Sequence, residues 1–240
     1  MISLLLPTRQ RPNNLLRLAE SVADTADDIR DIEIVTYMDF DDHTYNDIEH
    51  LPLKWIQIYG PREYDGLVNL SAMWNQCYEA CHGDILMHCG DDIVFRTKGW
   101  DTTVRETFDQ YPDRLIFAFG RDGYQDANNF GTHGFIHRAW VDTVGYFVPP
   151  YFVSDFNDTF LNDVSKAIGR HIEIDIYTEH MHYINGKAEI DQNTRERLQR
   201  HEENNPGALY SSDKIQGEIS DAISRLQAAM DNRDPDCTSA

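Results

Sequence analysis

The chain has 240 residues, 41% of them hydrophobic, which is enough to bury one sizeable core and lies near the upper end of single-domain size. Its formal net charge of -20 repels the phosphates of a nucleic acid, so broad nonspecific nucleic-acid binding is not expected. No stretch approaches the roughly 20 consecutive apolar residues that cross a bilayer, and Met1 leads directly into a predicted strand, without the segments of a signal peptide. We therefore expect no transmembrane segment and a cytoplasmic location.

The first half of the chain alternates strand and helix signals. Residues 2–6 form a continuous apolar run, and the apolar residues beyond the next polar turn recur at helical spacing. A second helix is predicted over residues 67–80, whose apolar side chains share one helical face, and Gly83 is typical of the stop that follows. Further strands are predicted at residues 32–38, 53–59 and 85–89.

The second half continues the alternation and then becomes highly charged. Strands are predicted at residues 115–119, 134–137 and 172–177, and helices at residues 140–144 and 156–168. Two charged surface helices are predicted at residues 192–203 and 212–230. Strands that alternate with helices indicate an α/β fold with a mostly parallel central sheet, and such sheets bind ligands beyond the carboxyl ends of their strands.

The dipeptide Asp91-Asp92 follows an apolar strand and Gly90, so two carboxylates are presented at a strand end where a ligand can approach the backbone. Mg²⁺ or Mn²⁺ usually binds through one or two carboxylates together with the phosphates of its substrate. A solvated Asp-Asp turn has the same sequence. Residues at the other strand ends are therefore needed to distinguish a metal site from a turn.

Two other predicted strands also end in polar residues. The first is followed by Pro7-Thr8-Arg9-Gln10-Arg11-Pro12, a loop that is suited to wrap a nucleotide with Arg9 or Arg11 near phosphate. The second ends at Asp39, whose carboxylate can accept hydrogen bonds from a base N–H or from ribose hydroxyls. These three strand ends together favour a nucleotide site.

The order of these features resembles the family 2 glycosyltransferases of the GT-A fold. In that family, a first strand ending in Pro-Thr-x-x-Arg-Pro precedes a strand ending in Asp, a helix with Asn, a Gly-Asp, and an Asp-Asp or Asp-x-Asp. The matching elements here are Pro7-Thr8-Arg9-Gln10-Arg11-Pro12, Asp39, Asn75, Gly83-Asp84 and Asp91-Asp92. The match covers roughly residues 1–100 and continues more loosely to about residue 195. It implies a Rossmann-like GT-A sheet flanked by helices.

The resemblance also implies which residues bind the donor and the metal. Asp91 and Asp92 would bind ribose, diphosphate and metal, with Asp92 favoured as the metal ligand. Trp74 stands where the family often has an arginine, and Arg62 is a candidate for the missing positive charge, although an exposed loop arginine would have the same sequence. The nucleotide-binding residues implied are Pro7, Thr8, Arg9, Arg11, Asp39, Arg62, Asn75 and Asp91.

The acceptor side is implied to lie in the second half of the chain, where such enzymes carry an acidic residue at the start of a helix. Ser154-Asp155-Phe156-Asn157-Asp158 is the matching segment. Asp155 or Asp158 would be the general base that removes the proton of the acceptor hydroxyl, and we prefer Asp155. A helix cap and a first-turn acidic residue would give the same pattern.

Two late histidines are candidates for further metal ligands. His180 and His182 follow the last predicted strand, and residues two apart on extended backbone project to the same side. Many GT-A enzymes use one such histidine. An imidazole that completes a carboxylate site suits Mn²⁺ better than Mg²⁺, although either ion remains open.

The sequence therefore predicts a metal-dependent glycosyltransferase that moves a sugar from a nucleotide-diphosphate donor, with a UDP-sugar as the first choice, to an acceptor hydroxyl. From the resemblance, we expect the reaction to invert the anomeric centre. Residues 1–190 form the GT-A domain, with the nucleotide-sugar half at 1–100 and the acceptor half at 101–190, and residues 191–240 form a charged helical extension. The acceptor, whether glycan, lipid, protein or modified nucleobase, is left open.

Two alternatives remain. A sugar nucleotidyltransferase uses a related sheet and also surrounds a metal and a diphosphate with carboxylates, but its first loop is generally rich in glycine, and the segment 7–12 contains none. A noncatalytic module that binds nucleotide sugars would have the same motifs. The sequence does not separate this second alternative from the enzyme.

Overall fold

The computed structural model of the chain describes residues 1–232, and their central feature is an eight-stranded sheet. The strands, in spatial order, are β3 (Lys54–Gly60), β2 (Ile32–Asp39), β1 (Ile2–Pro7), β6 (Ile85–His88), β9 (Gly134–His137), β8 (Phe117–Arg121), β10 (His171–His180) and β7 (Ile93–Phe95). The first four are parallel to one another, and β10 is parallel to β8. Antiparallel pairs join β9 to both of its neighbours and β7 to β10. The predicted α/β fold with a mostly parallel sheet is confirmed.

The continuous apolar run of β1 is explained by burial on both faces. Leu4 and Leu6 belong to the hydrophobic core on one side of the sheet, whereas Leu5 belongs to the core on the other side. A parallel strand that is covered twice needs apolar residues at every position instead of at alternate ones. The central position of β1 in the sheet therefore follows from its sequence.

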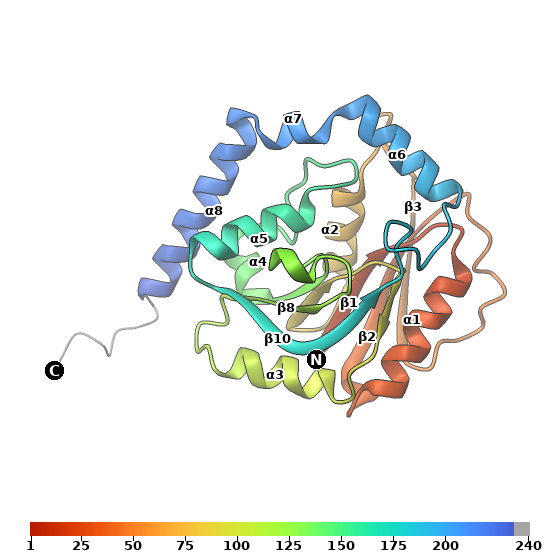
Figure 1. Cartoon of the computed structure of the whole chain (residues 1–240), viewed down its shortest axis with the longest axis horizontal. Helices are drawn as coiled ribbons and strands as arrows, with labels where there is room; N and C mark the ends of the chain where they lie inside the picture. Colours follow the sequence, from red (N-terminus) through yellow and green to blue (C-terminus); the bar gives the residue numbers. More distant parts are fainter. Residues whose placement is uncertain (233–240) are drawn as a thin grey trace.

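Helices cover both faces of the sheet. On one face, α1 (Pro12–Thr25) and α3 (Trp100–Asp109) contribute buried side chains to the core that contains Leu4. On the other face, α2 (Leu70–Ala80), α4 (Arg138–Val144) and α5 (Asn157–Ala167) pack around Leu5. The chain ends in α6 (Gln192–Asn204), α7 (Pro206–Tyr210) and α8 (Asp213–Asn232), which follow one another along the rim of the molecule, with α8 packed against α4 and α5 (Figure 1).

Some elements differ from the sequence prediction for local reasons. The helix α2 begins at Leu70, because the preceding residues form a small hairpin of β4 (Glu63–Tyr64) and β5 (Leu67–Val68). Asn69 then caps the helix by accepting a hydrogen bond from the N–H of Ala72 at 2.9 Å. The sequence patterns do not reveal β7, which has three residues, or α3, which carries few apolar side chains. Short 3-10 helices span Ile29–Asp31 and Asp126–Asn128.

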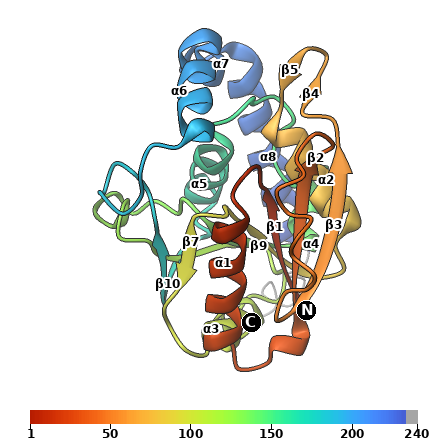
Figure 2. The ribbon, with the colours of Figure 1, turned by 90° about the vertical axis from the view of Figure 1, so that its right-hand side faces the viewer.

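The helix α6 lies beyond the carboxyl ends of β1, β2 and β3, as the two perpendicular views agree (Figures 1 and 2). Its position places a charged, mostly polar helix over the edge of the sheet where a ligand is expected. Within residues 1–232, no helix combines the length and the apolarity that a membrane span requires.

Gly83 shows why one of the sequence motifs is needed for folding. A Cβ at this position would lie 2.8 Å from the carbonyl oxygen of Met1 and from the backbone nitrogen of Ser3. Backbone atoms at the start of a central strand cannot move aside easily. The glycine therefore permits the turn before β6 to pack against the beginning of β1.

We predict that Gly83→Ala lowers the free energy of unfolding by about 1–3 kcal/mol, as overpacking typically does. Urea denaturation of the full chain measures this change. Gly217→Ala is the matched control, because Gly217 is exposed within α8 and an added Cβ meets nothing within 4 Å. The control should raise the free energy of unfolding by roughly 0.5–1 kcal/mol. A Gly83→Ala protein as stable as the wild type would contradict the steric explanation.

Candidate functional site

A cavity of about 560 Å³ is lined by residues at the carboxyl ends of the central strands and by residues of α6. Residues from both halves of the chain line it, together with α6 residues such as Thr194 and Arg197. With the exception of Asn75, every residue that the sequence analysis selects for nucleotide, metal or catalysis contributes to its wall. These residues are Pro7, Thr8, Arg9, Arg11, Asp39, Arg62, Asp91, Asp92, Asp155, Asp158, His180 and His182.

Asn75 is not part of the cavity wall and instead has a structural role. Its Oδ1 accepts hydrogen bonds from the N–H groups of Phe147 and Val148 at 3.0 and 3.3 Å. Its Nδ2 donates to the carbonyl oxygens of Ser71 and Val148, both at 2.8 Å. These bonds attach the turn after α4 to α2. Asn75 therefore does not line the cavity in which the nucleotide is expected to bind.

Asp91 is buried and holds the strand ends together. Its side chain is 5% exposed, and Thr8 Oγ1 donates to its Oδ2 at 2.7 Å. Arg11 Nη1 and Asn14 Nδ2 approach its Oδ1 at 3.3 and 3.4 Å. Burial raises the pKa of Asp91, and the charge of Arg11 opposes this effect only in part. Asp91 thus connects the segment after β6 to the loop after β1 and to α1.

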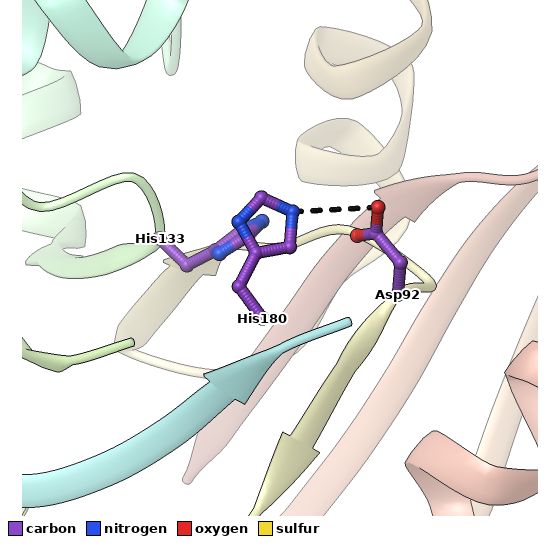
Figure 3. Close-up of side chains that lie close together, drawn as sticks. All are labelled: Asp92, His133 and His180. Carbon is purple, nitrogen blue, oxygen red and sulfur yellow. Dashed lines mark ion pairs between the residues drawn. The ribbon is translucent and has the colours of Figure 1, made fainter. Parts of the chain in front are cut away.

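Asp92 points instead toward two histidines (Figure 3). His180 Nε2 lies 3.4 Å from Asp92 Oδ2. One ligand atom from each of Asp92, His133 and His180 lies within 4.8 Å of the other two. Gly90 leaves room for this approach, because a Cβ there would lie 2.8 Å from Asp92 Oδ1 and 3.0 Å from His133 Nε2.

Neighbouring charges decide the protonation of this cluster. Burial by itself lowers the pKa of His180, but Asp122 and Asp92 outweigh it and raise the pKa to about 9. Burial and the charge of His180 lower the pKa of His133 to about 3. At neutral pH, His133 is therefore a neutral imidazole, and His180 carries a proton that a bound cation would have to displace.

Asp122 lies near Nδ1 of His180, the ring nitrogen that does not face Asp92. Its Oδ2 lies 3.8 Å from His180 Nδ1 and accepts a hydrogen bond from Thr132 Oγ1 at 2.8 Å. Its Oδ1 accepts from the N–H groups of Tyr124 and Gln125, each at 2.7 Å. At 3.8 Å the contact with His180 is an ion pair and not a hydrogen bond. The negative charge of Asp122 therefore favours the protonated ring of His180.

His182 lines the cavity but lies outside the three-residue cluster. Its ring centroid is 4.9 Å from that of His180, and burial lowers its pKa to about 4. The two histidines thus face the same cavity, as extended backbone predicts. His133 and Asp122 are not predicted from sequence, because no motif surrounds either residue. The pairing of β9 with β6 brings His133 beside the cluster.

Asp155 and Asp158 lie at the start of α5 in different environments. Asp155 accepts from Arg197 Nη1 at 2.7 Å and lies 2.6 Å from His201 Nδ1, so both of its oxygens are occupied. Asp158 has no ion pair within residues 1–232, and the N–H of Thr159 donates to its Oδ1 at 2.8 Å. Burial, assisted by the charge of Asp155, raises the pKa of Asp158 to about 6.

The arginines on the donor side are paired with carboxylates. Arg9 Nη1 donates to Asp39 at 2.8 Å, and to Asp41 at 2.6 Å. Arg11 forms a bidentate pair with Asp191, at the start of α6, at 2.6 and 2.8 Å. A further α6 residue, Glu196, pairs with Arg62, and Asn193 Nδ2 donates to the carbonyl oxygen of Arg9. The participation of α6 has no signal in the sequence beyond its high charge.

Neither protein-family models nor curated protein sequences match this chain. Solved structures do: residues 1–349 of TarS from S. aureus share 14% identity and a TM-score of 0.53, over 97% of this chain and 81% of that chain. The mannosyltransferase PcManGT from Pyrobaculum calidifontis, solved with GDP-Man and Mn²⁺, shares 11% identity and a TM-score of 0.60, over 95% and 73% of the two chains.

A third similar structure is glucosyl-3-phosphoglycerate synthase from Mycobacterium tuberculosis in complex with phosphoglyceric acid. It shares 12% identity and a TM-score of 0.53, over 75% of this chain and 71% of that chain. Identities this low establish a common fold and leave the activity to be argued from the site. The chain has the GT-A fold that the order of its sequence motifs predicts.

Proposed function

We propose that the chain is a glycosyltransferase that moves a sugar from a nucleotide-diphosphate donor to an acceptor hydroxyl. The observation that carries the proposal is one cavity that contains both a cluster suited to a divalent cation and, apart from it, a partly buried carboxylate with a raised pKa. The similar structures include PcManGT with GDP-Man and Mn²⁺ and TarS with UDP-GlcNAc, which supports a nucleotide sugar as the donor.

The donor would bind across the ends of β1, β2 and β6. Asp39 is 4% exposed, and its carboxylate beside Arg9 is suited to accept hydrogen bonds from a base or a ribose. Arg11 is suited to contact the diphosphate, since its guanidinium already binds two carboxylates, Asp91 and Asp191. A UDP-sugar remains the first donor to test.

A divalent cation would be held by Asp92, His133 and His180. One carboxylate and two imidazoles, all with ligand atoms within 4.8 Å of one another, form a donor set that suits Mn²⁺ better than Mg²⁺. When bound, such an ion supplies positive charge that stabilises the departing nucleoside diphosphate. This assignment replaces the pair of Asp91 and Asp92 with Asp92 alone, because Asp91 is engaged by Thr8.

For the general base we favour Asp158 over Asp155, the residue preferred from sequence. Asp155 is held by two basic side chains, whereas Asp158 is partly buried and has no ion pair within residues 1–232. Its carboxylate would take the proton of the acceptor hydroxyl while that oxygen forms a bond to the anomeric carbon. The bond from this carbon to the diphosphate oxygen breaks on the opposite face, and the configuration inverts.

The two alternative functions differ from this one in their products. Incubation of the chain with Mn²⁺ and either a panel of nucleotide sugars or a nucleoside triphosphate with a sugar phosphate tests all three. Release of a nucleoside diphosphate supports the glycosyltransferase, because slow transfer to water yields this product. Formation of pyrophosphate from a nucleoside triphosphate and a sugar phosphate would identify a nucleotidyltransferase. Binding without any product would identify a noncatalytic module.

We predict that Asp92→Asn and His133→Gln each weaken Mn²⁺ binding by about tenfold or more, because each removes a ligand and even outer-shell changes cost 10–100-fold. Electron paramagnetic resonance of free Mn²⁺ measures the affinity without turnover. The melting temperature of Asp92→Asn should stay nearly unchanged, and its metal-dependent UDP binding should be lost.

His182→Gln is the matched control for these variants, since His182 lines the same cavity outside the cluster. Its Mn²⁺ affinity should remain close to that of the wild type. A strong loss in His182→Gln together with no loss in His133→Gln would show that His182 is the ligand and His133 is not.

We further predict that activity depends on the ionisation of Asp158. A carboxylate acts as a base only when ionised, so with a pKa of about 6 the turnover rate should be full above pH 7 and fall as the pH drops through 6. Asp158→Asn should lower kcat by roughly 10²- to 10⁴-fold and spare UDP binding. Loss of transfer in Asp155→Asn with activity retained in Asp158→Asn would restore Asp155 as the base.

A further inference from the structure

One arginine in the cavity wall lacks an acidic partner. Arg200 lies on α6 and lines the cavity, and no carboxylate within residues 1–232 forms an ion pair with it. Its Nε is buried and has no hydrogen-bond partner in this part of the chain. A buried N–H group without a hydrogen-bond acceptor costs free energy. An anionic ligand in the cavity would supply the missing partner.

Most charges around Arg200 are already paired with one another. Glu196 is paired with Arg62, and Asp155 is paired with Arg197. Arg200 itself is in no ion pair within residues 1–232, and Asp158, which lines the same cavity, forms none either. Burial and the nearby Arg62 lower the pKa of Arg200, although an arginine remains protonated at any physiological pH.

The position of Arg200 separates it from the metal-binding end of the cavity. Asp92, His133 and His180 form the metal-binding end. On α6, Arg197 and His201 flank Arg200, and both contact Asp155, which lies just before α5. The turn of α6 that carries Arg200 therefore lies at the end of the cavity at which α5 begins. On the proposed function, the acceptor hydroxyl is deprotonated at this end.

We propose that Arg200 binds an anionic group of the acceptor, which makes the acceptor a hydroxyl compound that carries a phosphate or a carboxylate. The inference rests on the proposed function, because Asp158 identifies the acceptor end of the cavity. A guanidinium presents N–H donors in a planar fork that matches both anions. Arg197 lies one helical turn away on α6 and lines the same cavity, so it is placed to share the anion.

Glycerol 3-phosphate and glycerol provide a charged and a neutral probe. Each is titrated calorimetrically into the full chain saturated with UDP and Mn²⁺. We expect the wild type to bind glycerol 3-phosphate and not glycerol. Arg200→Gln should weaken glycerol 3-phosphate binding by about tenfold or more, since a charge-assisted hydrogen bond is lost, and leave UDP affinity unchanged. Arg200→Lys, which keeps the charge and loses the fork, should show a smaller loss.

Arg195→Gln is the matched control. Arg195 lies on the exposed face of the same helix, so the substitution removes an equal charge away from the cavity. Its affinity for glycerol 3-phosphate should equal that of the wild type. An equal loss in both variants would show a general effect of net charge and overturn the proposal.

Other results overturn the proposal in distinct ways. If Arg200→Gln weakens UDP and glycerol 3-phosphate by the same factor, Arg200 contacts the donor diphosphate instead of the acceptor. If the wild type binds glycerol 3-phosphate and glycerol equally, no anion site exists at Arg200. A wild type that binds no nucleotide would contradict the proposed function, and the same titrations of the nucleotide-free chain would still show whether Arg200 binds an anion.

Discussion

The architecture of the site depends on the buried carboxylate of Asp91 and its link through Arg11 to Asp191. Thr8 and Arg11 bring the loop after β1 to this carboxylate, and Arg11 then extends to the start of α6. Residues separated by as many as 180 positions are thereby joined at one strand end. Because a buried carboxylate must be hydrogen-bonded, the alternative to this network is an unpaired charge that costs several kcal/mol. Folding of the loop, of α1 and of α6 is therefore linked to one acidic side chain.

The adjacent Asp92 is left free by this arrangement to face the ligand. Asp91 is buried and Asp92 is partly buried, and the pKa of Asp91 is raised whereas that of Asp92 is lowered. The difference arises because the protonated His180 stands beside Asp92, whereas the charge of Arg11 and a hydrogen bond from Thr8 compensate the burial of Asp91 only in part. Asp91 therefore has a structural role, whereas Asp92 is available to bind a ligand.

Much of the sheet and its strand-end residues can be predicted from sequence, because both depend on local patterns. The apolar run of β1 and the Asp91-Asp92 pair are visible within a few residues. The helix α6 is also predicted, at residues 192–203, but its contact with the site is not, and neither is that of His133. The antiparallel pairing of β9 and a contact between Arg11 and Asp191 place them there. The resemblance also assigned Asn75 to the nucleotide, but packing uses its amide to attach a turn, and no sequence pattern distinguishes these two uses.

The carboxylates of α6 give the cavity a particular electrostatic character. Asp191 and Glu196 occupy Arg11 and Arg62, so guanidinium groups suited to phosphate are already neutralised in a chain with a net charge of -20. A phosphate that binds either arginine has to displace a carboxylate from it, and the affinity then reflects the difference between two anions instead of the full strength of one pair. Arg200 has no such competitor within residues 1–232, so an anion that binds there gains a partner without displacing one. Discrimination among anions can therefore differ between the two ends of one cavity.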